Sequence, residues 1–486
     1  MLFTEPTFLF LFLPVLLALY FAPGSRTHGG YANWLLLIAS VIFYVKGGGS
    51  FTWLMLASIA FNYWMAIAVS RRRSRAWLAF AIAANLTVLG IFKYANFFAD
   101  NINTLFLVLR LRPLVVPRVL LPIGISFFTF HAISYVVDVY RRDATAQKSP
   151  VHAALYLLLF PQLIAGPIIR YRDIADQLAE RQVTVDDLAG GIRRFVIGLA
   201  KKVLIANVVA GPADRIFAMP LAQLSTGHAW LGLVCYTLQI YFDFSGYSDM
   251  AIGLGRMFGF RFPENFRWPY IADTVQEFWR RWHISLSTWF RDYLYVPLGG
   301  NRVPAARMYR NLVTVFFLCG LWHGASWNFV IWGLWHGTFL VVERVFGWRS
   351  AGSRPQAAPA TLAGRVAAHV YTLAVVMVGW VFFRAETLPE SLAFLRALAG
   401  LSRAVATTYT VSWFFTPELA LALAAGAIGS IPWVPALAAR IQAAPPRTGV
   451  AWSIPALNTA ALAALLVASI MQMAARTYNP FIYFRF

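Results

Sequence analysis

Long apolar runs recur along the whole chain and constrain its fold more than any other feature. They cover residues 8–22, 31–46, 51–69, 76–91, 119–140, 192–212, 229–258, 311–345, 366–383, 410–430 and 452–473. About 20 apolar residues in a helix span the hydrocarbon core of a bilayer. Only helices and closed barrels satisfy all backbone hydrogen bonds there. The runs therefore predict an all-α polytopic membrane protein with about ten transmembrane helices, forming a single membrane-embedded domain over residues 1–486.

Composition and charge agree with this class. Charged residues make up 13% of the chain, against about 25% in a soluble domain. The net charge of +21 is expected in loops that stay on the cytoplasmic side, close to anionic headgroups. Nucleic-acid binding would need a soluble basic face, which this sequence lacks. Cys235 and Cys319 lie inside apolar runs, so we expect buried thiols and no disulfide framework.

Basic residues set the predicted orientation. Residues 71–75 hold four arginines between two apolar runs, which marks a cytoplasmic loop. Counting the apolar runs from this loop places both the N-terminus and the C-terminus on the outer side of the membrane. The arginine-rich loop 259–310 then falls on the cytoplasmic side. The run 151–166 is short and contains Pro161, so it predicts a re-entrant or interfacial segment.

The stretch 320–337 carries two histidines, His323 and His336, each within a Trp-His-Gly triplet. An ionisable side chain at membrane depth is a functional candidate by default. We expect residues 311–345 to form a helical hairpin with His323 at its bend. His336 is expected inside a helix, where Gly333 and Gly337 permit close packing. The residues alone leave two roles open for His323, a site role and a hydrogen-bonded position in the interior. They favour a packing role for His336 and a hydrogen-bonded buried position for His131.

Residues 273–293 have the pattern of an amphipathic helix in a membrane interface. Its apolar residues fill an arc of about 120° and are Val275, Phe278, Trp279, Trp282, Leu286, Trp289, Phe290 and Tyr293. The charged side chains lie on the other side. Asp273 and Gln276 resemble a capping box at its start. His283 falls at the edge of the apolar arc, where it could reach into a cavity beneath the helix.

Charged side chains inside apolar runs need a reason. Lys201 and Lys202 would each cost about 2.5–3.5 kcal/mol at the bilayer centre, so they must lie near an interface or face the protein interior. Asp243, Ser245 and Asp249 leave two possibilities open, which are lining the path of an acceptor or pairing with arginines. A zinc site built from the histidines is disfavoured, because their spacing matches no ligand signature.

Two segments resemble the membrane-bound O-acyltransferase family, and within it the alginate O-acetyltransferase (AlgI-like) branch. They are EFWRRWHISLSTWFRDYLYVPLGGNR at 277–302 and LWHGASWNFVIWGLWHG at 321–337. Supporting segments are residues 121–130, 160–167, 241–250 and 479–486. The resemblance runs along the chain, with 119–345 as the catalytic core region. It implies a ring of helices around a central tunnel and acyl transfer at a buried histidine.

The resemblance also implies roles for individual residues. His323 matches the catalytic histidine and His283 the second polar residue of the site. Imidazole suits the chemistry, because a sugar hydroxyl is a poor nucleophile until a general base takes its proton. We expect the substrate to contact Trp282, Ser287, Asp292, Tyr293, Asn328, Asp243 and Ser245. We expect the phosphates of the donor to meet Arg280, Arg281 and Arg291. No metal and no bound cofactor are expected.

The predicted function is transfer of acetyl groups from cytoplasmic acetyl-CoA across the inner membrane, for O-acetylation of an exopolysaccharide. The implied partners are the lipid bilayer, a periplasmic acetyltransferase partner protein and the polysaccharide, with no nucleic acid. The arginine-rich loop would equally suit an acidic acyl-carrier protein, so D-alanyl transfer of the teichoic-acid type stays open. A polysaccharide or proton transport subunit without chemistry is a further alternative, although the repeated halves of many transporters are missing.

Overall fold

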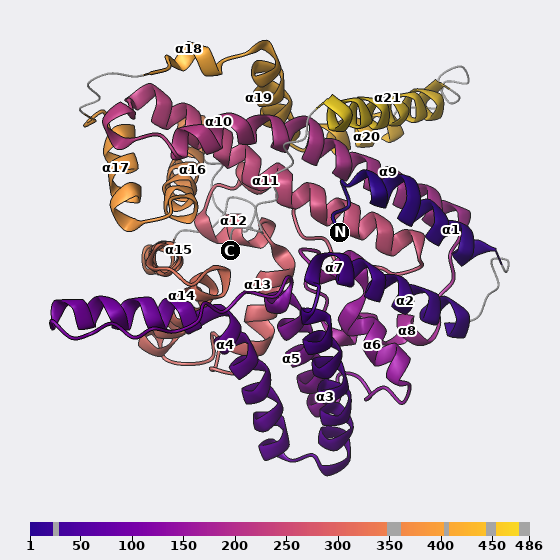
Figure 1. Ribbon diagram of the computed structural model, residues 1–486. Helices are drawn as coiled ribbons and strands as arrows, with labels where there is room; N and C mark the ends of the chain where they lie inside the picture. The colour runs from indigo at the N-terminus through magenta and orange to yellow at the C-terminus, as the bar shows by residue number, and fades with distance from the viewer. Residues whose placement is uncertain (23–28, 348–360, 403–407, 444–452, 476–486) are drawn as a thin grey trace. The chain divides into compact units, whose positions relative to one another are not determined.

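The computed structural model describes residues 1–22, 29–347, 361–402, 408–443 and 453–475, and all regular structure in these ranges is helical. The chain divides into two packing units, Met1–Phe195 with Met250–Pro263, and Val196–Asp249 with Glu264–Phe486. An all-α architecture is therefore confirmed for the described part of the chain (Figure 1). The C-terminal motif 479–486 lies outside the described residues. The single domain over 1–486 stays a prediction.

The first unit contains the N-terminal helices. They are η1 (Phe8–Phe12), α1 (Leu13–Phe21), α2 (Gly29–Gly48), α3 (Phe51–Arg72), α4 (Arg75–Val108), α5 (Ile125–Arg141), α6 (Pro150–Leu158), α7 (Phe160–Leu163), α8 (Tyr171–Ala179) and most of α9 (Val185–Ala200). Aromatic rings hold the unit together, as where Phe43 meets Phe160 at a centroid distance of 5.4 Å. Asn62 of α3 and Asn85 of α4 exchange buried side-chain hydrogen bonds of 2.8 and 3.1 Å, the kind of polar contact that joins helices inside a bilayer.

The second unit contains the remaining helices. They are η2 (Lys201–Ala206), α10 (Asn207–Phe217), η3 (Leu221–Gln223), most of α11 (Thr226–Met257), η4 (Pro269–Ile271), α12 (Val275–Arg281), α13 (Ile284–Phe290), η5 (Arg291–Tyr295), α14 (Ala305–His323), α15 (Trp327–Val345), α16 (Leu362–Arg384), α17 (Leu388–Leu398), α18 (Val411–Phe414), α19 (Pro417–Gly429), α20 (Trp433–Ala443) and α21 (Ser453–Ala475). η2 and η5 are π-helices.

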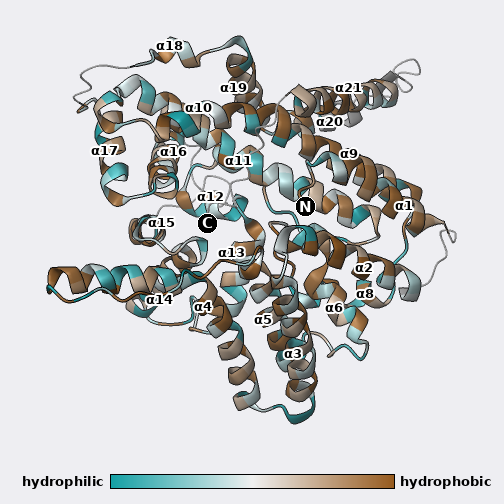
Figure 2. Ribbon diagram, in the orientation of Figure 1, coloured by the Kyte–Doolittle hydropathy of each residue, from teal (hydrophilic) through white to brown (hydrophobic). Residues whose placement is uncertain are grey.

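Six helices of the described residues are long and apolar enough to cross a membrane. They are Gly30–Gly48, Phe51–Arg72, Arg75–Val108, Val185–Phe217, Leu362–Arg384 and Pro455–Ala475. Phe8–Phe21 and Pro417–Gly429 are shorter apolar helices. Hydrophobic residues run along helices such as α2, α9 and α21 (Figure 2). The chain is therefore a multi-pass membrane protein, while the number of ten crossings and the ring around a tunnel stay predictions.

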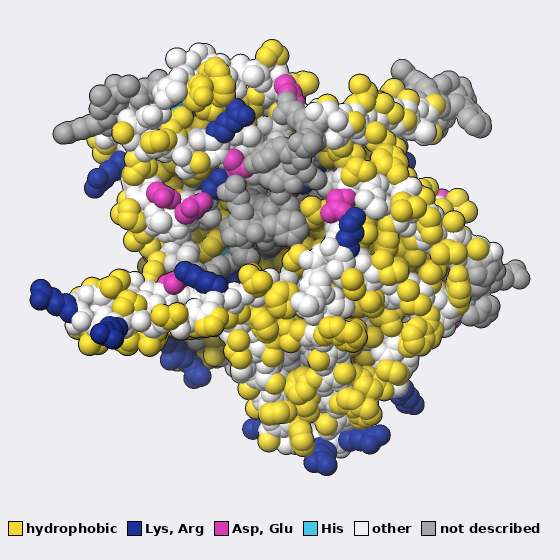
Figure 3. All heavy atoms as spheres, viewed as in Figure 1, with side chains coloured by type: hydrophobic (Ala, Val, Ile, Leu, Met, Phe, Trp, Pro, Cys, Tyr) yellow, Lys and Arg dark blue, Asp and Glu magenta, His cyan; other side chains and the backbone are white. Residues whose placement is uncertain are grey.

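The surface of the first unit shows two features of a membrane protein, exposed apolar side chains on its long helices and basic side chains at a connection between them. Large apolar side chains point outward on the candidate spans, as with Trp53, 78% exposed, and Trp64, 66% exposed. Lys and Arg side chains gather at the connection between α3 and α4 (Figure 3). There the arginines of residues 71–75 are exposed. This separation of apolar spans from a basic turn is the pattern expected of a bilayer-embedded helix pair.

The predicted hairpin at 311–345 is confirmed. α14 ends at His323, and α15 begins at Trp327. The two helices approach closely where glycines face them, since a Cβ on Gly320 would collide with the carbonyl oxygen of Phe329, and one on Gly333 with that of Phe316. Gly333 therefore has the packing role that the sequence predicted, and His323 stands at the bend.

The short apolar run 151–166 does not form one long helix. α6 has nine residues and α7 has four, and Leu159 between them leaves the helical region with ψ 113°. Nearly every side chain from Ala153 to Ile169 is buried in the first unit. Non-helical backbone at membrane depth is tolerated where protein covers it, so this segment fits the expected re-entrant or interfacial piece.

Candidate functional site

The segment expected to be one amphipathic helix over 273–293 is broken in two. α12 ends at Arg281, α13 begins at Ile284, and His283 between them has φ +43° and ψ 55°, the left-handed region. The expectation of a continuous helix is wrong here. A left-handed non-glycine residue costs roughly 1–2 kcal/mol, so the surrounding contacts must hold His283 in this conformation.

The segment 265–267, which has no regular secondary structure and begins eighteen residues upstream of His283, supplies those contacts. The Arg267 amide donates to the Arg281 carbonyl at 3.0 Å, and the Ile284 amide donates to the Asn265 carbonyl at 2.9 Å. The break thereby recovers backbone hydrogen bonds that a helix interruption would otherwise leave unmade. Residues 265–267 therefore form backbone hydrogen bonds with both the end of α12 and the start of α13.

The start of α12 is capped from two directions. Thr274 Oγ1 accepts from the Glu277 amide at 3.0 Å, so the expected capping box of Asp273 and Gln276 is wrong by one residue. The carboxylate of Glu343, on α15, accepts from the Val275 and Gln276 amides at 2.5 and 2.9 Å. Anionic groups stabilise a helix N-terminus. Glu343 therefore ties α12 to the hairpin.

His283 is buried, with 1% of its surface exposed. Its Nδ1 lies 3.1 Å from Asn265 Oδ1, and the ring of Phe244 packs against it at a centroid distance of 4.6 Å. Its Nε2 is buried and has no hydrogen-bond partner within the described ranges. Burial lowers the pKa of the His283 imidazole to about 3, which keeps the ring uncharged at physiological pH.

His323 is also buried, and aromatic rings surround it. The Trp322, Trp332 and Phe383 rings lie at centroid distances of 4.9, 4.9 and 5.2 Å, all nearly perpendicular to the imidazole. Trp322 is also a neighbour of His283, at 6.4 Å. The structure therefore brings the two expected catalytic histidines to a common tryptophan. An apolar site of this kind strengthens polar interactions with any group that enters it.

His336 packs in the interior of the same unit. Its ring meets those of Trp279 and Trp332 at 5.1 and 5.3 Å, and a Cβ on Gly379 would lie 2.6 Å from its Nε2. These contacts agree with a packing role. Neither of its ring nitrogens has a hydrogen-bond partner among the residues that the structure describes, so its burial carries a desolvation cost.

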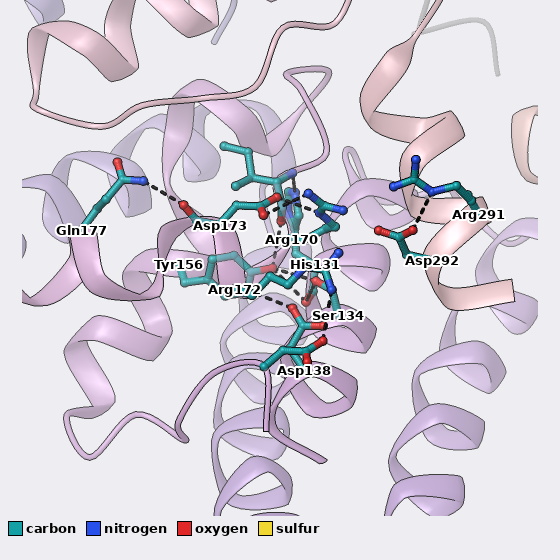
Figure 4. Close-up of polar contacts among 12 residues, drawn as sticks. His131, Ser134, Asp138, Tyr156, Arg170, Arg172, Asp173, Gln177, Arg291 and Asp292 are labelled. Atoms are coloured by element: carbon teal, nitrogen blue, oxygen red, sulfur yellow. Dashed lines mark hydrogen bonds and ion pairs between the residues drawn. The ribbon is translucent and has the colours of Figure 1, made fainter. Parts of the chain in front are cut away.

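His131, in the first unit, lies in a buried polar network (Figure 4). Its Nε2 accepts from the Ile169 amide at 3.3 Å, and its carbonyl oxygen accepts from Ser134 and Tyr156 hydroxyls at 2.9 and 3.2 Å. The expectation of a hydrogen-bonded buried histidine is confirmed for Nε2.

The buried carboxylates of α11 pair with lysines. Lys202 Nζ lies 2.5 Å from Asp243 Oδ1, and Lys201 Nζ lies 2.6 Å from Asp249 Oδ2. Both lysines stand at the start of the π-helix η2. The pairs shown here are with lysines, and both expected possibilities, lining the path of an acceptor and pairing with arginines, stay predictions. The lysines face the protein interior, which is one of the two expected placements. Ser245, on α11, is also buried.

The residues that we expected to contact the substrate each have different neighbours. Trp282 is buried against Trp380 at a centroid distance of 4.9 Å. Asn328 uses its amide to bond the Ala385 carbonyl at 2.7 Å, which holds the start of α15. Tyr293 packs on Trp289 at 5.1 Å. Ser287 is half-buried on α13.

The arginines expected to meet the donor are paired with acids. Arg280 and Arg281 contact Glu277 at 3.4 and 2.8 Å. Arg291 contacts Asp292 at 2.7 Å (Figure 4). The Arg280 and Arg291 side chains keep 55% and 60% of their surface exposed, so their charges remain accessible at the protein surface. Within the described residues, no three His, Cys, Asp or Glu side chains group as metal ligands would.

Three residues of the site were missed by reasoning on the sequence. Asn265 bonds His283, Trp322 lies beside both histidines, and Phe383 of α16 packs on His323. Asn265 stands in a stretch with no motif of its own. Trp322 was visible only as part of the Trp-His-Gly triplet, and Phe383 comes from a helix sixty residues further on.

Comparison with known proteins defines the class. A model of the MBOAT, membrane-bound O-acyltransferase, family matches residues 124–369, about half of the chain. The chain is 44% identical to the "Probable alginate O-acetylase AlgI" of Azotobacter vinelandii over the full length of both chains. It is 37% identical to the "Peptidoglycan O-acetyltransferase" of Helicobacter pylori, over 83% of this chain and 80% of that one.

A further relative is the "Teichoic acid D-alanyltransferase" of Bacillus subtilis, 32% identical over 43% of this chain and 55% of that one. The chain belongs to the membrane-bound O-acyltransferase family. It is therefore an acyltransferase enzyme, as the resemblance implied, and its similarity to the alginate O-acetylase of Azotobacter vinelandii extends over its whole length.

Proposed function

We propose that this enzyme moves acetyl groups from cytoplasmic acetyl-CoA to hydroxyl groups of an exopolysaccharide outside the inner membrane. The observation that carries the proposal is the placement of His323 and His283, two buried imidazoles that share Trp322 as a ring neighbour. Full-length similarity to alginate O-acetylases favours acetyl as the acyl group and an alginate-like glycan as the acceptor.

His323 acts as the general base in this proposal. The acceptor hydroxyl loses its proton to the imidazole while its oxygen attacks the thioester carbonyl. The carbon–sulfur bond then breaks, and the proton passes to the departing CoA thiolate. A positioned base contributes typically 10²–10⁴-fold to such a step. The aromatic wall of Trp332 and Phe383 would keep water from hydrolysing the thioester.

The donor approaches from the cytoplasmic face of α12. Arg280 on α12 and Arg291 on η5 have exposed side chains, and arginine is well suited to phosphate recognition. Their pairing with Glu277 and Asp292 would lower the net attraction, so phosphates would compete with these carboxylates. No resident metal or cofactor is part of the proposal.

The remaining assignments follow the same proposal. Both termini lie on the periplasmic side, where a periplasmic partner protein would collect the acetyl group or act on the polysaccharide. D-alanyl transfer from an acidic carrier protein is the second candidate, favoured by the similarity to the teichoic acid enzyme. That similarity covers less than half of the chain, so acetyl transfer remains the first choice.

His323→Ala tests the proposal in cells and with purified protein. Polymer acetylation is measured by mass spectrometry, and release of CoA from labelled acetyl-CoA is followed in nanodiscs. We expect both to be lost at unchanged protein levels. His152→Ala is the matched control, since His152 is half-buried on α6, and we expect it to keep activity. Normal acetylation by His323→Ala would refute the proposal, and turnover of a D-alanyl carrier thioester alone would select the second candidate.

A further inference from the structure

We infer that Asn265 is a positioning residue that holds His283 as its Nδ1–H tautomer, which leaves the Nε2 lone pair as the acceptor for a substrate hydroxyl. The inference deepens the proposed function and rests on it, because it assigns a task to the second histidine of the proposed site. It requires two things, the orientation of the Asn265 amide and the location of the single proton on His283.

The Asn265 amide can be oriented from its neighbours. The Ser285 backbone amide lies 3.3 Å from the atom assigned as Oδ1. A backbone N–H only donates, so the atom facing it must be the amide oxygen. The Ser285 hydroxyl donates to the same oxygen at 2.9 Å, and Asn265 Nδ2 donates to Ser248 Oγ of α11 at 3.0 Å. A flipped amide would place NH₂ against N–H, so the network excludes it.

The oxygen then fixes the proton on His283. Nδ1 lies 3.1 Å from Asn265 Oδ1, and two acceptors would repel each other at that distance. Nδ1 must therefore carry the hydrogen. Burial keeps the imidazole neutral, so the ring has no second proton and Nε2 bears a lone pair.

The surroundings of His283 leave Nε2 available. The rings of Phe244, Phe266 and Trp322 pack around the imidazole, and Nε2 is buried without a partner in the part of the chain that the structure describes. A buried acceptor without a hydrogen-bond partner costs about 1–3 kcal/mol of desolvation free energy. A hydroxyl donor removes that cost, whereas the carbonyl of a thioester offers no proton. Nε2 can thus accept from a hydroxyl of the acceptor substrate, and it makes no hydrogen bond with the thioester carbonyl of the donor.

Asn265 is well built for this task. It is fully buried, its main-chain oxygen accepts from the Ile284 amide at 2.9 Å, and its side chain is held at both ends by Ser248 and Ser285. The same residue therefore supports the left-handed turn at His283 and sets its tautomer. A side chain fixed at every polar atom orients its neighbour with little freedom.

The tautomer can be read directly by ¹⁵N NMR of the full chain in nanodiscs, with ¹⁵N-labelled histidine. His283→Gln identifies the signal. We expect a neutral ring with protonated Nδ1 and unprotonated Nε2 in the wild type, and a shift toward the other tautomer in Asn265→Ala. Protonated Nε2 in the wild type, or an unchanged signal in Asn265→Ala, would overturn the inference.

Kinetics supply a second test, because substitution of a residue with only a structural role would not change these kinetic parameters. We expect Asn265→Ala to lower kcat of acetyl transfer about tenfold or more, with a larger change in the KM for the acceptor than for the donor. Asn265→Asp keeps the acceptor oxygen but adds a negative charge beside Nδ1, so the acid limb of its pH–rate profile should move to higher pH. Asn311→Ala is the control, because Asn311 is a buried asparagine that bonds the Leu298 carbonyl.

The outcomes separate the inference from the proposed function. If His283 shows the expected tautomer but His323→Ala retains acetyl transfer, the proposed function fails and the assignment of the tautomer stands. If His323→Ala abolishes transfer while Asn265→Ala behaves like Asn311→Ala, the role of Asn265 fails and the proposed function stands.

Discussion

His283 and His323 come from different helices and meet at one ring, that of Trp322. The centroid of this ring lies 6.4 Å from the His283 imidazole and 4.9 Å from the His323 imidazole. Trp322 precedes His323 at the end of α14, whereas His283 stands at the break between α12 and α13. The ring of Trp322 is therefore a packing neighbour that the two histidines share.

Trp322→Leu should lower kcat of acyl transfer by about tenfold to a hundredfold, because both imidazoles lose a fixed neighbour and a misplacement of 1 Å can cost about a hundredfold in rate. Trp322→Phe should recover part of the rate. The measurement is labelled acetyl release by purified protein. Trp327→Phe, at an exposed tryptophan of α15, is the control. Full activity of Trp322→Leu would show that the ring does not position the histidines.

The stability of the protein should depend on pH through His283. Burial lowers the pKa of His283 from 6.5 to about 3, so the neutral ring stabilises the fold above pH 6.5 and this contribution is lost as the pH falls toward 3. At pH 5 the loss is about 2 kcal/mol. His283→Gln cannot take up this proton. Thermal unfolding in detergent at pH 7 and pH 5 should show a smaller decrease for the variant, and parallel decreases would contradict the buried neutral state.

The ion pair of Lys202 and Asp243 should matter mainly when one partner is removed. Lys202→Met leaves a buried carboxylate and should destabilise the protein by about 3–5 kcal/mol. The double variant Lys202→Met with Asp243→Leu should recover most of this loss. Unfolding midpoints in detergent measure both. Equal midpoints for the single variant and the wild type would indicate that Asp243 keeps its charge compensated in another way.

Gly320→Ala should disturb the packing of α14 against α15, the hairpin whose bend holds His323. Its new Cβ would collide with the Phe329 carbonyl oxygen of α15, and a backbone atom cannot rotate away. We expect a lower yield of folded protein by size-exclusion chromatography, together with lower activity per molecule. Gly90→Ala is the matched control, since a Cβ at this helical glycine of α4 meets no atom within 4 Å. A normal yield and rate for Gly320→Ala would mean that the helices separate easily.

Local patterns predicted much of the fold, because apolar runs and glycine positions are properties of single segments. The hairpin of α14 and α15 and the close approach at Gly333 followed from such patterns. The break at His283 did not. No glycine or proline marks it, and the apolar arc continues through it, so the cause is a tertiary one, the hydrogen bonds from Asn265 and Arg267.

The site was predictable only in its histidines. These stood out because ionisable groups are rare in apolar segments. The lysine partners of Asp243 and Asp249 lie more than forty residues away in the chain, and no local rule chooses between them and the more numerous arginines. Asn265 has an ordinary sequence environment, and its importance appears only once its amide is seen between His283 and Ser248.

The carboxylate of Glu343 has a mechanical consequence. It accepts hydrogen bonds from the first two amides of α12, and it lies near the C-terminal end of α15. The helix before His283 and the hairpin whose bend holds His323 are therefore in contact at a second point besides Trp322. Two points of attachment prevent pivoting. We therefore expect α12 to follow the hairpin when the hairpin tilts in the bilayer, so that the spacing of the two imidazoles changes less than the tilt of the helices.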